Sequence, residues 1–427
     1  MYINPEIRLL LTSHVLTPIY ILLDYNHALH CSRMRTRMKF PECGKDERVQ
    51  VDPMTSPPYK WICFLSIKSA TGERYKGSGF KIHLPEVNRT AIVTSGHCTF
   101  IRGESAGEYA AKITVTFPGK HSVKVRQKDL YASPEYIETG DADHDYGLIL
   151  LPGNSDDGFG WSAIIPDEEL KNRLVTNCGY TGDKPEGTMW ITGGAITEGP
   201  EPTPNRIYHT TDTMGGQSGS PVYTWYDGFW TVIAVHSDGG CPNSAARFTS
   251  QMIFRFLERI NGLKKKSLRS VAFPDVYLRC DGTGGGTVNC QHKLPSSLES
   301  FYIYPVEMAP SLAPRQTTYK VAIESAHFTH VLIRMNSKGM SSYKKPGGGE
   351  VNCQFQPAST WESYFLRQET NGSYSFRSVQ FPHCYIRLDG TGVHSRSDGG
   401  GGTVNCQYYD DPFVPASSWE SFHMEEH

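Results

Sequence analysis

The sequence of 427 residues lacks an excess of charge of either sign. Lys plus Arg number 42, Asp plus Glu number 44, and the formal net charge is −2. A protein that binds nucleic acid through its phosphates usually carries a clear basic excess on one face. The balance of charge therefore argues against a nucleic-acid partner.

Long apolar runs are also missing. The most apolar segment, residues 9 to 23, is too short for a helix that spans a membrane. It lies in residues 1 to 42, which we interpret as a leader or pro-segment, with a poorly ordered extension as the alternative. We therefore expect no membrane span and a secreted protein that is made as a zymogen.

The 11 cysteines include no CxxC pair, which is the spacing typical of zinc clusters. Because 11 is an odd number, at least one thiol is unpaired or pairs between chains. A bridge between Cys63 and Cys98 is conceivable, but their spacing gives it no support. From the cysteines and the chemistry below we expect no metal and no organic cofactor.

Glycine (41) and proline (27) are abundant, which favours many turns and a β architecture. Short apolar runs bounded by turn residues fill the region 43 to 263 and predict an all-β fold. The predicted strands are residues 61–67, 91–95, 112–117, 147–151 and 230–236, and one helix is predicted at 251–260. The basic run 264–266 then reads as a solvated linker.

Residues 268 to 427 contain three copies of one motif. Each copy has a Phe, at 273, 328 or 381, followed by an alternating apolar strand, and later a Gly-rich turn that leads into the sequence VNCQ. Three β units of about 50 residues cannot bury their apolar faces singly, so they must close on one another. The repeat predicts a β-trefoil, in which Cys290, Cys353 and Cys406 are buried hydrophobic residues at equivalent positions.

Three motifs between residues 90 and 222 supply groups that peptide hydrolysis requires. His97 follows the apolar strand 91–93, Asp145 precedes the apolar run 147–151, and Ser218 lies in the sequence GGQSGSPV. The order His, Asp, Ser is that of chymotrypsin, whereas the α/β-hydrolases and subtilisin have different orders. We predict that Ser218 attacks the scissile carbonyl, that His97 takes its proton, and that Asp145 orients His97.

The glycines around Ser218 let the backbone double back and direct amide hydrogens into a small space. We predict that the amides of Gly216 and Ser218 form the oxyanion hole. Asp141 and Asp143 compete with Asp145 for the third place in the triad. Asp145 is preferred because it directly precedes the apolar strand, which places its side chain at the buried end.

At these residues a family resemblance emerges. The runs GYTGDKP at 179–185, DTMGGQS at 212–218 and VIAVH at 232–236 are similar to stretches of the V8-like glutamyl endopeptidases. The resemblance covers residues 44 to 263 and implies a chymotrypsin-like double β-barrel, protein or peptide substrates, and a preference for Glu at P1. It implies S1 positions at Thr213 and His236, and processing near Phe40 or Pro41.

The C-terminal repeats resemble the fascin-like trefoils. The resemblance indicates the fold but does not decide whether the ligand of the trefoil is a glycan or a protein. One alternative is a binding protein whose protease domain is silent or has a different P1 preference. In a second alternative the trefoil stabilises or inhibits the protease domain within the same chain. Labelling by a fluorophosphonate probe separates a silent domain from an active one.

Overall fold

The computed structural model describes residues 46 to 427, except for residues 85–86, 104–106, 155, 283–284, 294, 311–318 and 345–346. Residues Asp46–His427 cluster as one compact unit. The predicted leader, residues 1 to 42, and the predicted processing position near Phe40 or Pro41 lie outside the described residues. Within the described part of the chain, no helix has both the length and the apolar character needed to cross a membrane.

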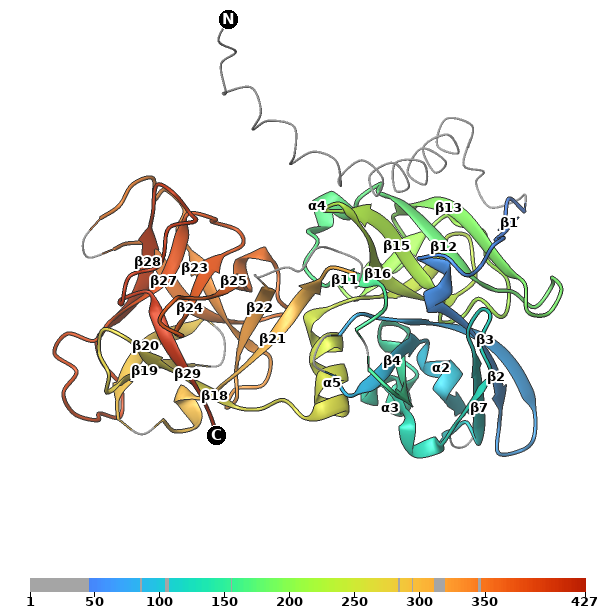
Figure 1. The fold of residues 1–427 in the computed structure, drawn as a ribbon, viewed down its shortest axis with the longest axis horizontal. Helices are drawn as coiled ribbons and strands as arrows, with labels where there is room; N and C mark the ends of the chain where they lie inside the picture. The colour runs from blue at the N-terminus through green and yellow to red at the C-terminus, as the bar shows by residue number, and fades with distance from the viewer. Residues whose placement is uncertain are drawn as a thin grey trace, which may run out of the picture. The chain divides into compact units, whose positions relative to one another are not determined.

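The fold is all-β, with few and mostly short helices (Figure 1). Among the described residues, the α-helices are α2 (Gly96–Thr99), α3 (Pro134–Thr139), α4 (Asp167–Leu170) and α5 (Ser250–Asn261). The predicted strands are confirmed to within three residues at each end, and α5 confirms the predicted helix at 251–260. Thr249 caps α5, because its side chain accepts a hydrogen bond from the amide of Met252.

A seven-stranded antiparallel sheet occupies the first third of the described chain. Its strands, in spatial order, are β8 (Val123–Val125), β7 (Lys112–Thr116), β2 (Ile62–Lys68), β3 (Arg74–Lys81), β4 (Arg89–Thr94), β10 (Gly147–Pro152) and β9 (Leu130–Ala132). The two short strands β5 (Phe100–Arg102) and β6 (Gly107–Tyr109) pair separately. Strand β10 is buried from residue 147 to 151, as its continuous apolar run predicts.

A second group of strands follows. It comprises β1 (Val49–Gln50), β11 (Gly160–Ser162), β12 (Leu174–Tyr180), β13 (Met189–Thr197), β14 (Arg206–His209), β15 (Pro221–Tyr226), β16 (Phe229–Asp238) and β17 (Asn243–Arg247). Strands β12 to β17 are linked by antiparallel pairs. One apolar cluster contains residues from both groups, including Phe80 of β3 and Tyr223 of β15, so the two groups share a core.

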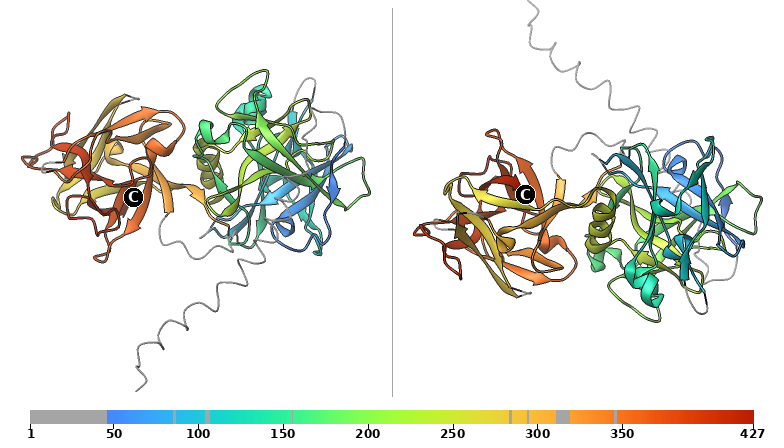
Figure 2. Two further views of the ribbon diagram at one scale, coloured as in Figure 1. Left: turned by 90° about the horizontal axis from the view of Figure 1, so that it is seen from above. Right: turned by 90° about the horizontal axis from the view of Figure 1, so that it is seen from below.

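The described residues from 266 onward contain twelve strands, and this region is coloured yellow to red in Figures 1 and 2. They are β18 (Lys266–Ser270), β19 (Val276–Asp281), β20 (Gly286–His292), β21 (Phe301–Met308), β22 (Tyr319–Ser325), β23 (Val331–Asn336), β24 (Glu350–Phe355), β25 (Ser363–Gln368), β26 (Tyr374–Ser378), β27 (Cys384–Asp389), β28 (Thr403–Tyr408) and β29 (Ser421–Glu426). The pairings β18–β21, β21–β22, β22–β25, β25–β26, β26–β29 and β29–β18 form a closed ring. Three hairpins, β19–β20, β23–β24 and β27–β28, complete the pattern.

The three sequence repeats occupy equivalent places in this pattern. Cys290, Cys353 and Cys406 are fully buried, and they pair across their hairpins with Leu278, Ile333 and Ile386. The amides of Phe273, Phe328 and Phe381 each donate to the hydroxyl of the serine three residues earlier. All three Phe side chains pack, partly buried, against the same apolar cluster. The repeated cysteines are therefore buried thiols that form no disulfide and pack in a shared core.

Candidate active site

His97 and Asp145 form a close pair. They lie just beyond two neighbouring strand ends, because Thr94 of β4 pairs with Gly147 of β10. The His97 Nδ1 atom is 2.7 Å from Asp145 Oδ2, and the His97 amide donates to Asp145 Oδ1 at 2.8 Å. Asp145 is 3% exposed, so its carboxylate is held by the histidine rather than by solvent. The Asp145 carboxylate therefore fixes both the imidazole ring and the main chain of His97 through two hydrogen bonds.

The electrostatics of this pair favour a charged imidazole. Burial alone lowers the pKa of His97, but the Asp145 carboxylate and the neighbouring Cys98 thiol together outweigh burial and raise the pKa of His97 well above 6.5. An adjacent carboxylate stabilises the cationic form of histidine in this way. The same arrangement stabilises an imidazolium that forms during proton transfer.

The two competing carboxylates are engaged elsewhere. Asp141 accepts from the amide of Asp143 and is 2.8 Å from His144 Nδ1. Asp143 pairs with Arg206, with a distance of 2.9 Å from Nε to Oδ1. Of the three acids considered from the sequence, Asp145 is the one in contact with His97.

Ser218 lies in a loop that is held against the seven-stranded sheet by its main chain. The Ser218 carbonyl accepts a hydrogen bond from the amide of Ser78 at 2.8 Å. The Ser218 hydroxyl donates to the carbonyl of Ser237 at 3.4 Å. Among the described residues no hydrogen bond joins the Ser218 hydroxyl to His97, and such bonds are often long or poorly aligned before substrate binds.

One carbonyl connects the segment that carries His97 to the loop that carries Ser218. The carbonyl of His236 accepts from the Ser95 hydroxyl at 2.8 Å and from the Gly219 amide at 2.7 Å. Gly219 has a φ of +84°, and a Cβ there would lie 2.1 Å from Thr94 Oγ1 and 2.2 Å from the Ser78 carbonyl oxygen. The approach of the two segments therefore requires glycine at this position.

The predicted oxyanion donors flank Gln217. Gly216 has a φ of +103°, and its carbonyl accepts from the Ser78 hydroxyl at 2.9 Å. Within the described part of the chain, neither the amide of Gly216 nor that of Ser218 is bonded to a protein acceptor. Both N–H groups are therefore available to a ligand oxygen.

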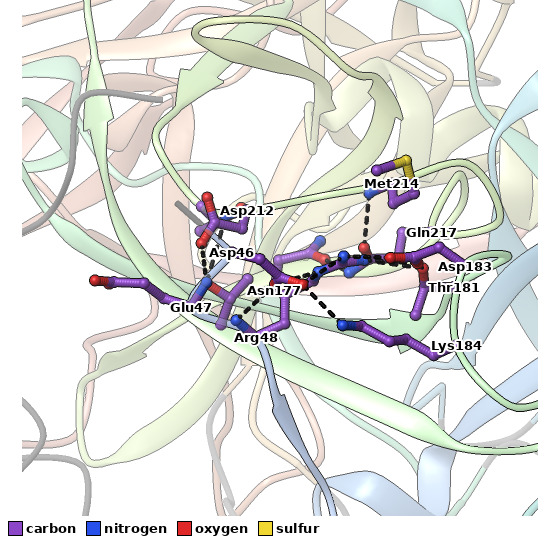
Figure 3. Close-up of polar contacts among 12 residues, drawn as sticks. Asp46, Glu47, Arg48, Asn177, Thr181, Asp183, Lys184, Asp212, Met214 and Gln217 are labelled. Atoms are coloured by element: carbon purple, nitrogen blue, oxygen red, sulfur yellow. Dashed lines mark hydrogen bonds and ion pairs between the residues drawn. The ribbon is translucent and has the colours of Figure 1, made fainter. Parts of the chain in front are cut away.

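The Gln217 side chain, which is fully buried, anchors this loop from within. It donates to Asn177 Oδ1 at 3.0 Å and accepts from the amide of Met214 at 2.9 Å (Figure 3). Asn177 in turn donates to the hydroxyl of Ser220 at 2.8 Å. The Ser218 loop is thus fixed by a buried network of side-chain amides that the sequence patterns did not reveal.

The two predicted S1 residues have different neighbours. The Thr213 hydroxyl donates to Asn243 Oδ1 at 2.8 Å, and no direct hydrogen bond joins Thr213 to His236 in the described structure. His236 is 2% exposed, and its Nδ1 lies 3.3 Å from His209 Nε2. His209 Nδ1 is 2.8 Å from the Thr211 hydroxyl. Sequence reasoning missed His209 and Asn243, because neither belongs to a recognisable motif.

Both of these histidines are neutral. Burial lowers the pKa of His236 well below 6.5, and the neighbouring His209 and His97 lower it further. Burial lowers the pKa of His209 to about 3. Any interaction of this pair with a substrate starts from neutral imidazoles, in contrast to the cationic tendency of His97.

Cys63 and Cys98 are both free, buried thiols, so the conceivable bridge between them is not formed. Cys241, in the turn between β16 and β17, is disulfide-bonded. Over the described residues, no three or more His, Cys, Asp or Glu side chains are grouped so that they could hold a metal ion.

Comparison with models of protein families identifies the class of domain to which part of this chain belongs. The family model described as "Trypsin-like peptidase domain" matches residues 77–235, a range that contains His97, Asp145 and Ser218. This part of the chain is therefore a trypsin-like peptidase domain.

Several curated proteins have sequences similar to this one. A glutamyl endopeptidase of Staphylococcus aureus is 37% identical over 228 residues, covering 50% of this chain and 62% of the relative. A glutamyl endopeptidase of Bacillus licheniformis is 32% identical over 212 residues, covering 46% and 60%. A Bacillus subtilis protein named extracellular metalloprotease is 32% identical over 219 residues, covering 49% and 66%. The chain thus spans less than two thirds of the length of these relatives.

Among solved structures, one described as "Structure of Glu endopeptidase in complex with MPD" aligns with a TM-score of 0.40 and 25% identity. The alignment covers 52% of this chain and 98% of that one.

The close approach at Gly219 can be tested with a matched pair of alanine substitutions. Gly228 has a φ of +85°, but a Cβ there would meet nothing within 4 Å, so Gly228→Ala carries only the cost of positive φ, about 1–2 kcal/mol. Gly219→Ala adds a collision with main chain and should lower the free energy of unfolding by about 4 kcal/mol or more. Urea unfolding of both variants measures the difference, and equal losses would contradict the packing described here.

Proposed function

We propose that the protein is a secreted serine endopeptidase in which His97, Asp145 and Ser218 form the catalytic triad. The observation that carries the proposal is the His97–Asp145 pair at 2.7 Å, which lies beside the Ser218 loop through the shared carbonyl of His236. The pair and the loop lie within the trypsin-like peptidase match. The names of the relatives and the predicted leader support secretion.

In this mechanism the Ser218 oxygen attacks the carbonyl carbon of the scissile peptide bond as His97 takes its proton. Asp145 stabilises the imidazolium, which then gives the proton to the leaving amine. Water repeats the sequence on the acyl-enzyme. The free amides of Gly216 and Ser218 donate to the oxyanion as negative charge develops on it. The mechanism uses no metal and no organic cofactor.

The proposed organisation has two domains after the leader at 1–42. Residues 43–263 form a chymotrypsin-like double β-barrel, which the two groups of strands with a shared core support. Residues 268–427 form a β-trefoil, which the closed ring of six strands and the three equivalent hairpins support. The trefoil serves targeting or binding, with a glycan or a protein as its ligand.

The proposed substrates are proteins or peptides with an acidic residue, Glu above all, at P1. Two of the relatives are named glutamyl endopeptidases. The resemblance of the runs DTMGGQS and VIAVH to that family implies that Thr213 and His236 are S1 residues. A buried carboxylate needs donors that replace its water. Neutral imidazole N–H and hydroxyl groups supply donors without the full charge of an arginine.

Ser218→Ala should abolish turnover, with kcat reduced by about 10⁶-fold, while the melting temperature stays unchanged. A fluorophosphonate probe should label the wild-type protein and leave Ser218→Ala unlabelled. Ser122→Ala, which changes an exposed serine, is the control and should remain fully active. Labelling or activity that survives in Ser218→Ala would refute the mechanism, and a wild-type protein that is never labelled would favour a silent protease domain.

The pH dependence of probe labelling should report the ionisation of His97. The base must be neutral to accept the Ser218 proton, and Asp145, with a contribution from Cys98, holds the pKa of His97 well above 6.5. The labelling rate should therefore rise with pH and reach half its maximum above pH 6.5. Asp145→Asn should shift that midpoint downward and reduce the maximal rate by about 10⁴-fold. A wild-type midpoint at or below pH 6.5 would contradict the electrostatic role of Asp145.

The specificity proposal is tested at His236 with peptides that differ only at P1. Loss of a hydrogen bond to a charged group costs about 1.5–3 kcal/mol, roughly ten- to a hundredfold. His236→Ala should therefore lower kcat/KM for Glu by that factor and change kcat/KM for Leu or Ala much less. His121→Ala, which alters an exposed histidine, is the control. An equal loss for all peptides, or no preference for Glu over Gln in the wild type, would overturn the P1 assignment.

A further inference from the structure

A cluster of charged residues surrounds one buried arginine where the described chain begins. The guanidinium of Arg48, whose side chain is 3% exposed, bonds both oxygens of Asp46 at 2.8 and 3.0 Å. It also bonds both oxygens of Asp183, at 3.0 and 2.6 Å, and the hydroxyl of Thr181 at 2.9 Å (Figure 3). Lys184 joins the cluster through Asp46 at 2.8 Å. No motif in the sequence marks Arg48.

The loop that Arg48 holds, residues 181–183, lies directly against the main chain of Gly215 and Gly216. The Gly182 amide donates to the Gly215 carbonyl at 2.7 Å. A Cβ on Gly216 would lie 3.0 Å from both the Gly182 nitrogen and the Tyr180 oxygen, so the two stretches are in close contact. Movement of the loop 181–183 therefore moves the peptide units that precede Ser218.

The segment 46–51 makes a second contact with the stretch 212–216. The Glu47 amide donates to Asp212 Oδ2 at 2.8 Å, just before Thr213. The segment is itself anchored, because Val49 and Gln50 of β1 pair with β13 and the Val51 amide donates to the Met189 carbonyl at 2.9 Å. Residues 46–51 thus bear on both ends of the stretch 212–216.

The cluster is charged throughout the neutral and mildly acidic range. Burial alone lowers the pKa of Arg48, but hydrogen bonds to Asp46 and Asp183 outweigh it and raise the pKa. The hydrogen bond from Arg48 lowers the pKa of Asp183 to about 2. A carboxyl whose pKa is depressed on folding stabilises the protein above its unfolded pKa, and this contribution is lost only as the pH falls toward 2. The ion pair between Arg48 and Asp183 therefore persists throughout the neutral and mildly acidic pH range.

We propose that Arg48 and Asp183 are positioning residues for the oxyanion hole. Arg48 holds the loop 181–183, this loop holds Gly215 through the Gly182 amide, and the Gly216 amide is thereby kept in place. The inference rests on the proposed function, because it assigns a catalytic use to the Gly216 amide. Neither residue touches the substrate in this scheme.

The matched pair Asp183→Asn and Asp46→Asn tests the proposal in the full-length protein. Both variants remove one carboxylate partner from the same guanidinium, but only Asp183 lies on the loop that contacts Gly215. Asp183→Asn should lower kcat by about tenfold with KM changed less than threefold, because a displaced oxyanion donor costs less than the 10²-fold or more of a deleted one. Asp46→Asn should keep kcat within twofold of the wild type.

Arg48 itself is tested by two substitutions and a control. Arg48→Ala should lower kcat at least as much as Asp183→Asn, and Arg48→Lys should recover only part of it, because an ammonium cannot bond two carboxylates in a bidentate manner. Arg247→Ala is the control, since it removes a partly buried arginine that pairs with Asp167. It should lower the melting temperature without changing kcat more than twofold.

The outcomes distinguish failure of the positioning role from failure of the proposed protease function. If Asp183→Asn and Asp46→Asn have equal effects on kcat, or if every Arg48 and Asp183 variant loses only thermal stability, the positioning role is wrong while the protease assignment stands. If wild-type protein shows neither turnover nor probe labelling, the proposed function fails and the positioning role fails with it. Because Asp183→Asn is nearly isosteric, it gives a result even where Arg48→Ala does not fold.

Discussion

The hydrogen bond from the Ser78 amide to the Ser218 carbonyl joins the seven-stranded sheet to the loop that carries the candidate nucleophile. Ser78 is fully buried on β3, and its hydroxyl makes two further bonds. It accepts from the Tyr180 amide at 2.9 Å and donates to the Gly216 carbonyl at 2.9 Å. One small polar residue therefore joins β3, the end of β12 and the Ser218 loop.

This junction demands small residues around it. Gly179 faces Ser78, and a Cβ there would lie 2.8 Å from the Ser78 hydroxyl oxygen. Gly219 meets Thr94 and Ser78 even more closely. Because three segments distant in sequence share so little space, glycine is the residue that lets their main chains bond directly. The polar groups buried there are satisfied by one another, which makes the arrangement specific as well as compact.

The parts of the site that could be predicted are those with local sequence signals. His97 and Asp145 each adjoin a run of apolar residues that becomes a buried strand, and Ser218 lies among glycines that its turn requires. The rule that favoured Asp145 over Asp141 and Asp143 rested on that adjacency, and Asp145 is the acid that contacts His97. The C-terminal strands were predictable because three copies of one pattern reinforce a single interpretation.

The remaining contacts gave no local signal. Asp183 lies in the GYTGDKP run, but its partner Arg48 is 135 positions away, and nothing in either stretch of sequence indicates that the two residues pair. His209 and Asn243 gain their roles from His236 and Thr213, which lie 27 and 30 positions away. Only the folded chain shows that the Thr213 proton is already donated to Asn243. A residue type states what a side chain can do, whereas its neighbours decide which of its donors are free.

That last point bears on how the proposed S1 pocket accepts a carboxylate. His236 is neutral, and a bound anion would favour its charged form, so the approach of Glu raises the pKa of His236 from its low starting value. Thr213 can join in only if its hydroxyl turns away from Asn243. Asn243 Oδ1 then still accepts from the Gly240 amide at 3.0 Å, so no buried acceptor is left unpaired. Binding of an acidic side chain in the proposed pocket would therefore exchange one hydrogen bond of Thr213 for another, and any positive charge would arise at His236 rather than at an arginine or a lysine.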